Sequence, residues 1–265
     1  MILPYGPILL PLYGPFAIHS YGLFIALGII ISARYMYHNR SFKALHIDHL
    51  FIDIITVSIM AGIIGGRALE VLSNPLYYPS WYDRVALWEG GFSALGSIIG
   101  VMIITPLFLR IKNIPILPLL DCAALYAPLF QAIARIGCLF SGCCHGTPTD
   151  SWLSITYTHY STNAICNIAV HPTQLYSTIL LFGIFLLLVL VIQPYTKKAG
   201  QLFCTYIALA SLERFFVDFW RHDRIFIGDT FSFHQLIALI LCSFSVCMLY
   251  IITYTRHPFS KISSL

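Results

Sequence analysis

One stretch of the chain reads Ala134-Arg135-Ile136-Gly137-Cys138-Leu139-Phe140-Ser141-Gly142-Cys143-Cys144-His145-Gly146. Its first part ends a long apolar segment, and a turn rich in glycine and cysteine follows directly. A guanidinium at membrane depth is costly unless it is paired, so an arginine there indicates a functional site. Two further arginines, Arg67 and Arg214, also lie in apolar segments. Together the three predict a site inside a membrane protein that holds an anion.

The composition is that of an integral membrane protein. Of 265 residues, 58% are hydrophobic and only 10% are charged, whereas soluble domains carry about 25% charged residues. The net charge of +4 is modest, and the chain has no basic arm or run of like charges. We therefore expect the membrane as a partner and no nucleic acid.

Seven segments are long enough to cross roughly 30 Å of hydrocarbon as helices. They lie near residues 16–34, 50–72, 91–109, 116–139, 174–192, 201–217 and 232–254. The first has no basic residues before it and no clear cleavage site, so we expect a retained helix and not a signal peptide. The predicted fold is an all-α integral membrane protein with a single polytopic domain over residues 1–265.

The positive charges predict the orientation, because basic loops stay in the cytoplasm. Alternate connections and the C-terminal tail carry Arg34, Arg40, Lys43, Arg110, Lys112, Lys197, Lys198, Arg256 and Lys261. The other connections carry only Arg84, Arg221 and Arg224. We therefore expect the N-terminus outside and the C-terminus in the cytoplasm, with the long outward connection 140–173 folded as a small lid.

The partners that the sequence offers to Arg67 and Arg135 differ. Glu70 lies three positions after Arg67, so the two can pair on one helix face. Two roles therefore remain for Arg67: a structural ion pair with Glu70, or a functional role in the site. Arg135 has no acidic residue within a helical turn, and the nearest one in an apolar segment is Asp121, about four turns away. We expect Arg135 to find its partner across the bundle or in a ligand.

A second cationic region is predicted in the sixth apolar segment. Arg214, Asp218 and Arg221 lie at positions i, i+4 and i+7, hence on one helix face. In the structural alternative, the arginine side chains extend toward the membrane interface so that their charged ends reach water, and one salt bridge forms. The functional alternative, which we favour, is a cationic wall that binds a lipid phosphate through paired guanidinium hydrogen bonds.

Three cysteines, Cys143, Cys144 and Cys166, lie in the outward connection, where disulfides persist. A bridge from Cys143 or Cys144 to Cys166 would fix the lid, and plain packing is the alternative. The spacing Cys-x4-Cys-Cys-His from Cys138 also suggests a metal, but it fits no standard zinc pattern, so we expect none.

Two histidines at the outer side are candidates for a general base near neutral pH. His145 follows the two adjacent cysteines. His171 precedes Pro172, and proline suits the first turn of a helix, so His171 is expected at the start of the fifth segment. Hydrogen bonding at the membrane interface is the alternative role for both.

Taken in order, the motifs of this chain resemble those of the bacterial prolipoprotein diacylglyceryl transferase family over nearly the whole length. The first three segments contribute His19-Ser20-Tyr21-Gly22, Gly65-Gly66-Arg67 and Trp88-Glu89-Gly90-Gly91-Phe92-Ser93. Later segments contribute Ala134-Arg135-Ile136-Gly137, then His171-Pro172-Thr173-Gln174-Leu175-Tyr176, then Arg214, Asp218 and Arg221 in place of Arg-x3-Glu-x2-Arg.

The resemblance implies transfer of a diacylglyceryl group from phosphatidylglycerol to the lipobox cysteine thiol of a prolipoprotein, with release of glycerol 1-phosphate and no cofactor. It implies a multi-pass protein of the bacterial cytoplasmic (inner) membrane, with the active site toward the outer face. By carry-over, the catalytic candidates are Tyr21, Arg135 and Arg214. The substrate-binding candidates are Arg67, Arg135, Gly146, Asp218 and Arg221.

The chain departs from the family pattern in two places. Leu95 stands where the family has a proposed basic histidine, and the signature turn is a Cys-Cys variant with Cys138, Ser141 and Cys143 for Asn, Asn and Glu. Our hypothesis is that His145 or His171 serves as the base. Two other classes stay open: a divergent paralogue that uses its cysteines for other thiol or metal chemistry, and a non-enzymatic lipid-binding or transport protein.

Overall fold

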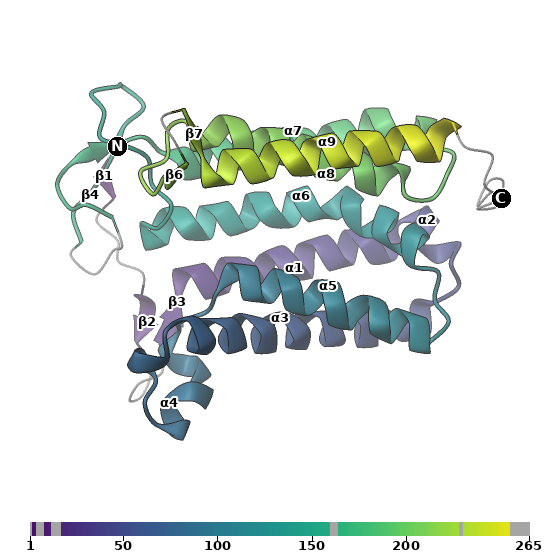
Figure 1. Ribbon diagram of the computed structural model, residues 1–265, viewed down its shortest axis with the longest axis horizontal. Coiled ribbons are helices and arrows are strands. Elements are labelled where there is room, and N and C mark those ends of the chain that lie inside the picture. Colours follow the sequence, from purple (N-terminus) through teal and green to yellow (C-terminus); the bar gives the residue numbers. More distant parts are fainter. Residues whose placement is uncertain (1, 4–7, 12–16, 160–163, 228–229, 255–265) are drawn as a thin grey trace. The chain divides into compact units, whose positions relative to one another are not determined.

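The computed structural model describes residues 2–3, 8–11, 17–159, 164–227 and 230–254 (Figure 1). These residues are mostly helical, as predicted for an all-α membrane protein. The chain divides into two compact units. Unit 1 contains Met1–Pro11, Ala17–Asn39 and Leu120–Leu265, and unit 2 contains Leu12–Phe16 and Arg40–Leu119. The single domain stays a prediction.

The long helices are α1 (Ser20–His38), α3 (Phe51–Ser73), α5 (Ala94–Ile111), α6 (Ile116–Ser141), α7 (Thr173–Leu186), α8 (Gln201–Asp218) and α9 (Phe233–Tyr254). The short helical segments are α2 (Arg40–Lys43), α4 (Trp81–Val85), η1 (Asp48–Leu50), η2 (Pro75–Tyr77), η3 (Leu87–Glu89), η5 (Gln193–Tyr195) and the π-helix η4 (Leu187–Ile192). The strands are β1 (Ile2–Leu3), β2 (Ile8–Pro11), β3 (Ala17–His19), β4 (Ile155–Tyr157), β5 (Ala169–Val170), β6 (Phe226–Ile227) and β7 (Phe231–Ser232).

Six described stretches are long and apolar enough to cross a membrane: Ser20–His38, Asp48–Ser73, Ala94–Ile111, Ile116–Ser141, Thr173–Tyr195 and Phe233–Tyr254. The remaining predicted span, 201–217, forms α8, which carries Glu213, Arg214 and Asp218 and is therefore more polar than the six. The first predicted span begins too early, because β3 pairs with β2 before α1 starts at Ser20. Seven crossings and their orientation stay predictions.

In unit 2, α3 and α5 pack closely because glycines face each other. A Cβ atom added to Gly65 would touch the carbonyl oxygen of Gly96, and one added to Gly100 would touch the carbonyl oxygen of Ala61. Small residues let membrane helices approach until their backbones touch. This contact fixes the relative position of the two helices.

In unit 1, α6, α7, α8 and α9 run side by side (Figure 1). A buried cluster joins α6, the π-helix η4 and α8, and it contains Ala124, Leu125, Tyr126, Leu188, Leu202 and Tyr206. Asp121 accepts hydrogen bonds from the backbone nitrogens of Gly200 (2.6 Å) and Phe203 (2.8 Å). It thereby satisfies donors at the first turn of α8, which have no partner within the helix. These hydrogen bonds account for the burial of the Asp121 carboxylate, so Asp121 needs no ion pair with Arg135, which lies toward the other end of α6.

The described part of the segment 140–173, which we call the lid, contains two short strands, and its role as a lid stays a prediction. Its strands β4 and β5 are antiparallel, and β1 pairs with β4 in parallel, giving the order β1-β4-β5. Leu139, at the end of α6, packs with Ile155, Tyr157 and Val170 in a buried cluster. The lid is thereby attached to the end of α6 that carries Arg135.

Candidate anion-binding site

Arg135 and Tyr21 are brought together where α6 meets α1. A Cβ atom at Gly137 would lie 2.9 Å from Phe24 Cβ and 3.3 Å from Tyr21 Cα, so a side chain there would push the helices apart. The rings of Phe24 and Phe140 stack at 5.6 Å just beyond this contact. As a result, Tyr21 interacts electrostatically with Arg135 and with the cysteines of the following turn.

The side chain of Arg135 is half-buried. Within the described part of the chain it forms no ion pair and no hydrogen bond. Glu213 of α8 interacts with Arg135 only at longer range and is hydrogen-bonded to Ser177. Because a guanidinium with unused donors is costly inside an apolar helix bundle, Arg135 is a candidate for binding an anionic ligand.

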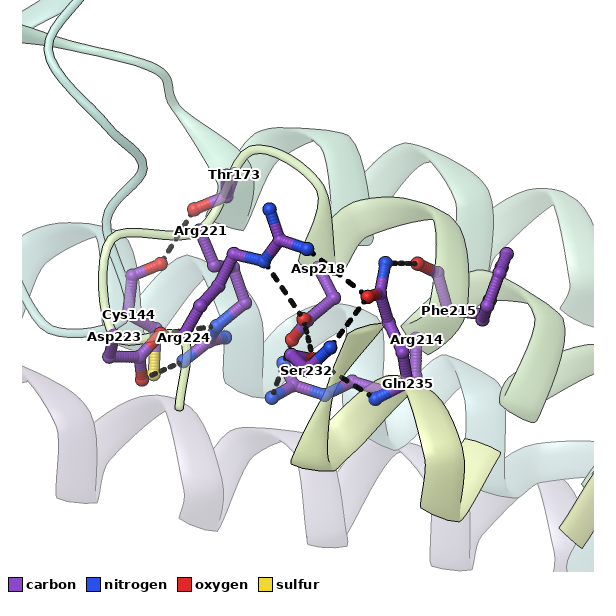
Figure 2. A network of polar contacts seen from close by, with 10 residues as sticks. All are labelled: Cys144, Thr173, Arg214, Phe215, Asp218, Arg221, Asp223, Arg224, Ser232 and Gln235. Atoms are coloured by element: carbon purple, nitrogen blue, oxygen red, sulfur yellow. Dashed lines mark hydrogen bonds and ion pairs between the residues drawn. The ribbon is translucent and has the colours of Figure 1, made fainter. Parts of the chain in front are cut away.

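Asp218 organises the end of α8 (Figure 2). Its buried carboxylate lies 3.4 Å from Arg214 Nη2 and 3.6 Å from Arg224 Nε, and it accepts a hydrogen bond from Ser232 Oγ. Gln235 Oε1 accepts from Arg224 Nη2 (3.1 Å) and from the backbone nitrogen of Ser232 (3.0 Å). Arg214 and Asp218 share one helix face, as predicted, and they form the salt bridge of the structural alternative. The cationic wall that binds a lipid phosphate stays a prediction.

Arg221 does not continue that face, because α8 ends at Asp218. Its guanidinium is buried and donates to Asp223 through Nε (2.8 Å) and Nη2 (2.6 Å). Burial alone would raise the pKa of Asp223, but these hydrogen bonds and the positive charge hold it below its ordinary value. Arg221 also interacts with Cys144, so it joins the end of α8 to the Cys-Cys turn.

Arg135, Arg214 and Arg221 form what we call the arginine cluster. Arg214 is repelled by both Arg221 and Arg135. Asp218 and Asp223 offset part of this charge, but no ion pair neutralises Arg135 among the described residues. Repulsion between cations is strong where water is scarce. A bound phosphate would relieve it and would match the paired donors of a guanidinium.

The turn that carries Cys143 and Cys144 is held by the start of α7. Thr173 Oγ1 donates to the Cys144 carbonyl oxygen (2.6 Å), and Gln174 Nε2 donates to the Cys143 carbonyl oxygen (2.8 Å). Gln174 also donates to the hydroxyl of Tyr157 (3.3 Å). Thr173 and Gln174 are each 1% exposed, so water does not compete for these bonds.

Gly146 is a junction of three segments. Its nitrogen donates to the His171 carbonyl oxygen (2.9 Å), and it forms a β-bridge with Arg221. A Cβ atom there would lie 2.6 Å from the Trp220 carbonyl oxygen, so a larger residue would separate the segments. The structure thus shows a packing role for Gly146, and its contact with substrate stays a prediction.

The two candidate bases lie on either side of this junction. His145 is buried, its Nδ1 lies 3.0 Å from the Gly146 carbonyl oxygen, and its ring stacks on His222 at 5.3 Å. His171 Nδ1 lies 3.2 Å from the Tyr176 hydroxyl. Both rings are held through Nδ1, which leaves Nε2 as the atom that would exchange a proton.

All eight cysteines are unbridged in the structure. The Sγ atoms of Cys138, Cys143 and Cys144 lie within 4.8 Å of one another. Cys166 instead donates to the carbonyl oxygens of His159 (3.4 Å) and Ala164 (4.0 Å). The structure therefore does not form the bridge from the turn to Cys166 that the sequence left open.

Arg67, in unit 2, has a different environment. It is 5% exposed, and its guanidinium lies 4.6 Å from the centre of the Tyr78 ring. It donates to the backbone carbonyl oxygens of Asp83, Arg84, Ala86, Gly90 and Gly91. Glu70 accepts from Asn74 Nδ2 (3.0 Å), so the predicted pair of Arg67 with Glu70 is not formed. Arg67 organises the 78–91 connection, and its contact with substrate stays a prediction.

Four residues on which this geometry depends are not among those predicted for the site: Thr173, Gln174, Glu213 and Arg224. Each had a signal in the sequence. Thr173 and Gln174 are the polar pair that opens an apolar segment, Glu213 is an acid directly before an intramembrane arginine, and Arg224 follows Asp223 in a short charged run. Only the fold shows which of these polar residues face one another.

Fold and site together define a multi-pass membrane protein with a cationic site at one end of a helix bundle. The sequence model of one protein family, prolipoprotein diacylglyceryl transferase, matches residues 7–251. The chain therefore belongs to the prolipoprotein diacylglyceryl transferase family, as its motifs predict. This confirms the predicted transferase class and gives no support to the two alternative classes.

Similar relatives carry the name phosphatidylglycerol–prolipoprotein diacylglyceryl transferase. That of Clostridium tetani is 32% identical over 244 residues, covering 89% of this chain and 94% of the relative. That of Thermotoga maritima is 31% identical over 252 residues, covering 89% and 83%. That of Clostridioides difficile is 32% identical over 221 residues, covering 83% and 85%. The bacterial family and the apolar helices indicate a multi-pass protein of the inner membrane.

Proposed function

We propose that this chain transfers the diacylglyceryl group of phosphatidylglycerol to the lipobox cysteine thiol of a prolipoprotein, and that the arginine cluster binds the lipid phosphate. The names of the relatives supply the donor and the protein acceptor. The observation that carries the assignment of the site is Arg135, half-buried and without a described partner beside Arg214 and Arg221.

The chemistry needs a cationic site at the leaving group. The acceptor sulfur forms a bond to the glyceryl carbon, and the bond from that carbon to the phosphate oxygen breaks. The electron pair stays on that oxygen, and glycerol 1-phosphate leaves with one more negative charge than the diester had. Cations fixed around the phosphate therefore stabilise the transition state more strongly than they stabilise the bound lipid before the reaction.

The three arginines would divide this task. Arg135 would contribute unpaired guanidinium donors to the phosphate. Arg214 is held by the buried Asp218, so it would approach the same phosphate from α8 without having to be ordered on binding. Arg221 is held by Asp223 at the rim of the cluster. Tyr21, which lies near Arg135, would contact the lipid from α1.

The acceptor thiol must lose its proton, because the thiolate is the reactive form. We propose His145 or His171 as the base, acting through Nε2 because each ring is held through Nδ1. The test is the pH dependence of transfer in His145→Gln and His171→Gln. An unchanged profile in both variants would contradict this role.

We further propose that the site faces the outer side of the membrane. In unit 1 the basic residues Lys197 and Lys198 lie just before α8 begins, whereas the arginine cluster lies where α8 ends. Basic connections stay in the cytoplasm, so the opposite end of α8 would face outward.

The experiment uses purified protein, phosphatidylglycerol and a peptide with a lipobox cysteine, followed by mass spectrometry of the peptide. We expect a diacylglyceryl mass gain with the wild type. Arg135→Gln should abolish it, and Arg110→Gln, at an exposed arginine of α5, should keep it as the matched control. Folded protein that binds the lipid but yields no product would contradict the proposed transfer.

A further inference from the structure

Cys138, Cys143 and Cys144, the thiol cluster, have no part in the steps above. Their Sγ atoms lie within 4.8 Å of one another. In a tetrahedral zinc site with Zn–S bonds of about 2.3 Å, the sulfur atoms are roughly 3.8 Å apart. A movement of about 1 Å or less per sulfur pair would therefore bring all three to ligand distance.

The backbone holds one of these cysteines, Cys144, in an uncommon conformation. Cys144 has φ of 61°, a left-handed value that side chains rarely adopt. Such conformations persist where surrounding contacts enforce them, and they gather at functional sites. Here Thr173 and Gln174 bind the carbonyl oxygens of Cys144 and Cys143.

The charges around the thiol cluster suit a site of negative charge. Three thiolates around Zn²⁺ leave one net negative charge, since three negative charges exceed two positive ones. Arg221 and Arg135 both interact favourably with a thiolate at Cys144, so the arginine cluster would stabilise the bound metal. Thiolates favour zinc and other soft ions, whereas magnesium and calcium favour oxygen ligands.

We propose that Cys138, Cys143 and Cys144 bind a zinc ion through three thiolates, and that the acceptor cysteine of the prolipoprotein takes the fourth position. The second half of the proposal rests on the proposed function. Catalytic zinc sites have three protein ligands and one open position. This replaces the expectation of no metal: the spacing fits no standard pattern, but the end of α6 and its turn bring positions i, i+5 and i+6 together.

The zinc would activate the nucleophile. A thiol bound to zinc loses its proton to solvent. The zinc-bound sulfur then forms the bond to the glyceryl carbon while the carbon–oxygen bond to the phosphate breaks. The thioether is a weak zinc ligand, so the product leaves and the fourth position is open again. Because Arg135 interacts with Cys138 and Cys144, the phosphate and the thiolate would be bound side by side.

The first test measures metal content in the full-length protein, purified under reducing conditions into lipid nanodiscs. We expect one zinc ion per chain by elemental mass spectrometry, lost in Cys143→Ser and in Cys144→Ser. Cys247→Ser changes an exposed cysteine of α9 and should keep the zinc. Copper in place of zinc, or equal zinc in wild type and Cys143→Ser, would overturn the proposal.

The second test replaces zinc with Co²⁺, whose bonds to thiolate give an absorption band that reports the ligands. A lipobox peptide with cysteine should shift this band, and the same peptide with serine should not. No shift with the cysteine peptide would overturn the role of the acceptor thiol.

Transfer measured on the same preparation separates the two proposals. Removal of the metal should lower the rate by about 100-fold, the usual effect of losing assistance to proton removal. Full transfer by metal-free protein would overturn the inference and leave the proposed function standing. A metal-loaded protein that responds to the cysteine peptide but makes no thioether would support the zinc site and contradict the proposed transfer.

Discussion

Arg67 and Arg135 are both arginines of apolar helices, but their surroundings differ. Arg67 is enclosed by backbone carbonyl oxygens of the 78–91 connection and by the Tyr78 ring. Arg135 has no ion pair or hydrogen bond within the described ranges and lies beside two further arginines. The two arginines therefore differ in how many of their guanidinium donors are already in use. On this ground Arg135, and not Arg67, is our candidate for binding an anion.

The largest effect expected from this comparison is on catalysis. Arg135→Gln should lower transfer by about 100- to 1,000-fold, the range seen when one donor to a developing negative charge is lost. Its thermal unfolding should stay close to that of the wild type, because no described contact is broken. The measurement is the rate of peptide modification per folded molecule. A rate within threefold of the wild type would place the phosphate elsewhere.

The matched substitution in unit 2, at Arg67, should lower the free energy of unfolding. Arg67→Ala leaves several buried carbonyl oxygens without a donor, which should cost about 3 kcal/mol. Arg67→Lys should also destabilise, because an ammonium cannot replace the planar set of donors. The measurement is the unfolding temperature in detergent. If Arg67→Ala unfolded like the wild type but lost transfer, Arg67 would be a substrate-binding residue and the comparison would fail.

A smaller effect is expected at the start of α7. Thr173→Val removes the donor to the Cys144 carbonyl oxygen, which should destabilise the turn by about 1–2 kcal/mol and lower transfer. The control is Thr205→Val, since among the described residues the Thr205 side chain donates only to the carbonyl oxygen of Gln201 in its own helix. Unfolding temperature and transfer rate are both measured. Equal losses in the two variants would show that the turn has no special role.

The smallest effect is the acid dependence of the Arg221–Asp223 pair. Because the pKa of Asp223 is held below its ordinary value in the folded protein, the pair stabilises the fold above the unfolded-state pKa. That contribution is lost as the pH falls through the folded-state pKa. Asp223 is 55% exposed, so solvent screens the pair and the effect is small.

The matched variant is Asp223→Asn, with unfolding temperatures measured between about pH 7 and about pH 3, the range in which aspartate titrates. The wild type should be the more stable protein at neutral pH, and the difference should shrink toward acid. A difference that is independent of pH would mean that the charge of Asp223 contributes nothing.

Much of the fold follows from the sequence because apolar runs of sufficient length are local signals. The segments 116–139 and 232–254 correspond to α6 and α9 within two residues at each end. The start of α1 was not predictable, because the pairing of β3 with β2 sets it. The end of α8 agrees with the predicted span 201–217 within one residue. The placement of Arg221 on the same helix face was wrong, because Arg221 lies beyond the helix and forms a bridge with Gly146, far away in the chain.

The sequence predicts where the charged residues of the candidate site lie along the helices, but it does not predict which groups they contact. The position of Arg135 in an apolar helix and the shared helix face of Arg214 and Asp218 follow from the sequence alone. The role of Arg67 depends on carbonyl oxygens of a connection whose conformation no local pattern specifies. The thiol cluster depends on the left-handed Cys144, which tertiary hydrogen bonds from α7 enforce.

The most direct test of the account is binding of phosphatidylglycerol, measured by native mass spectrometry in phosphatidylcholine nanodiscs. Wild type, Arg135→Gln and Arg110→Gln would be compared under the same conditions. We expect Arg110→Gln to keep the wild-type affinity and Arg135→Gln to lose at least about tenfold in affinity, the usual cost of one charge-assisted hydrogen bond. Equal affinity in all three proteins would contradict the claim that Arg135 binds the lipid phosphate.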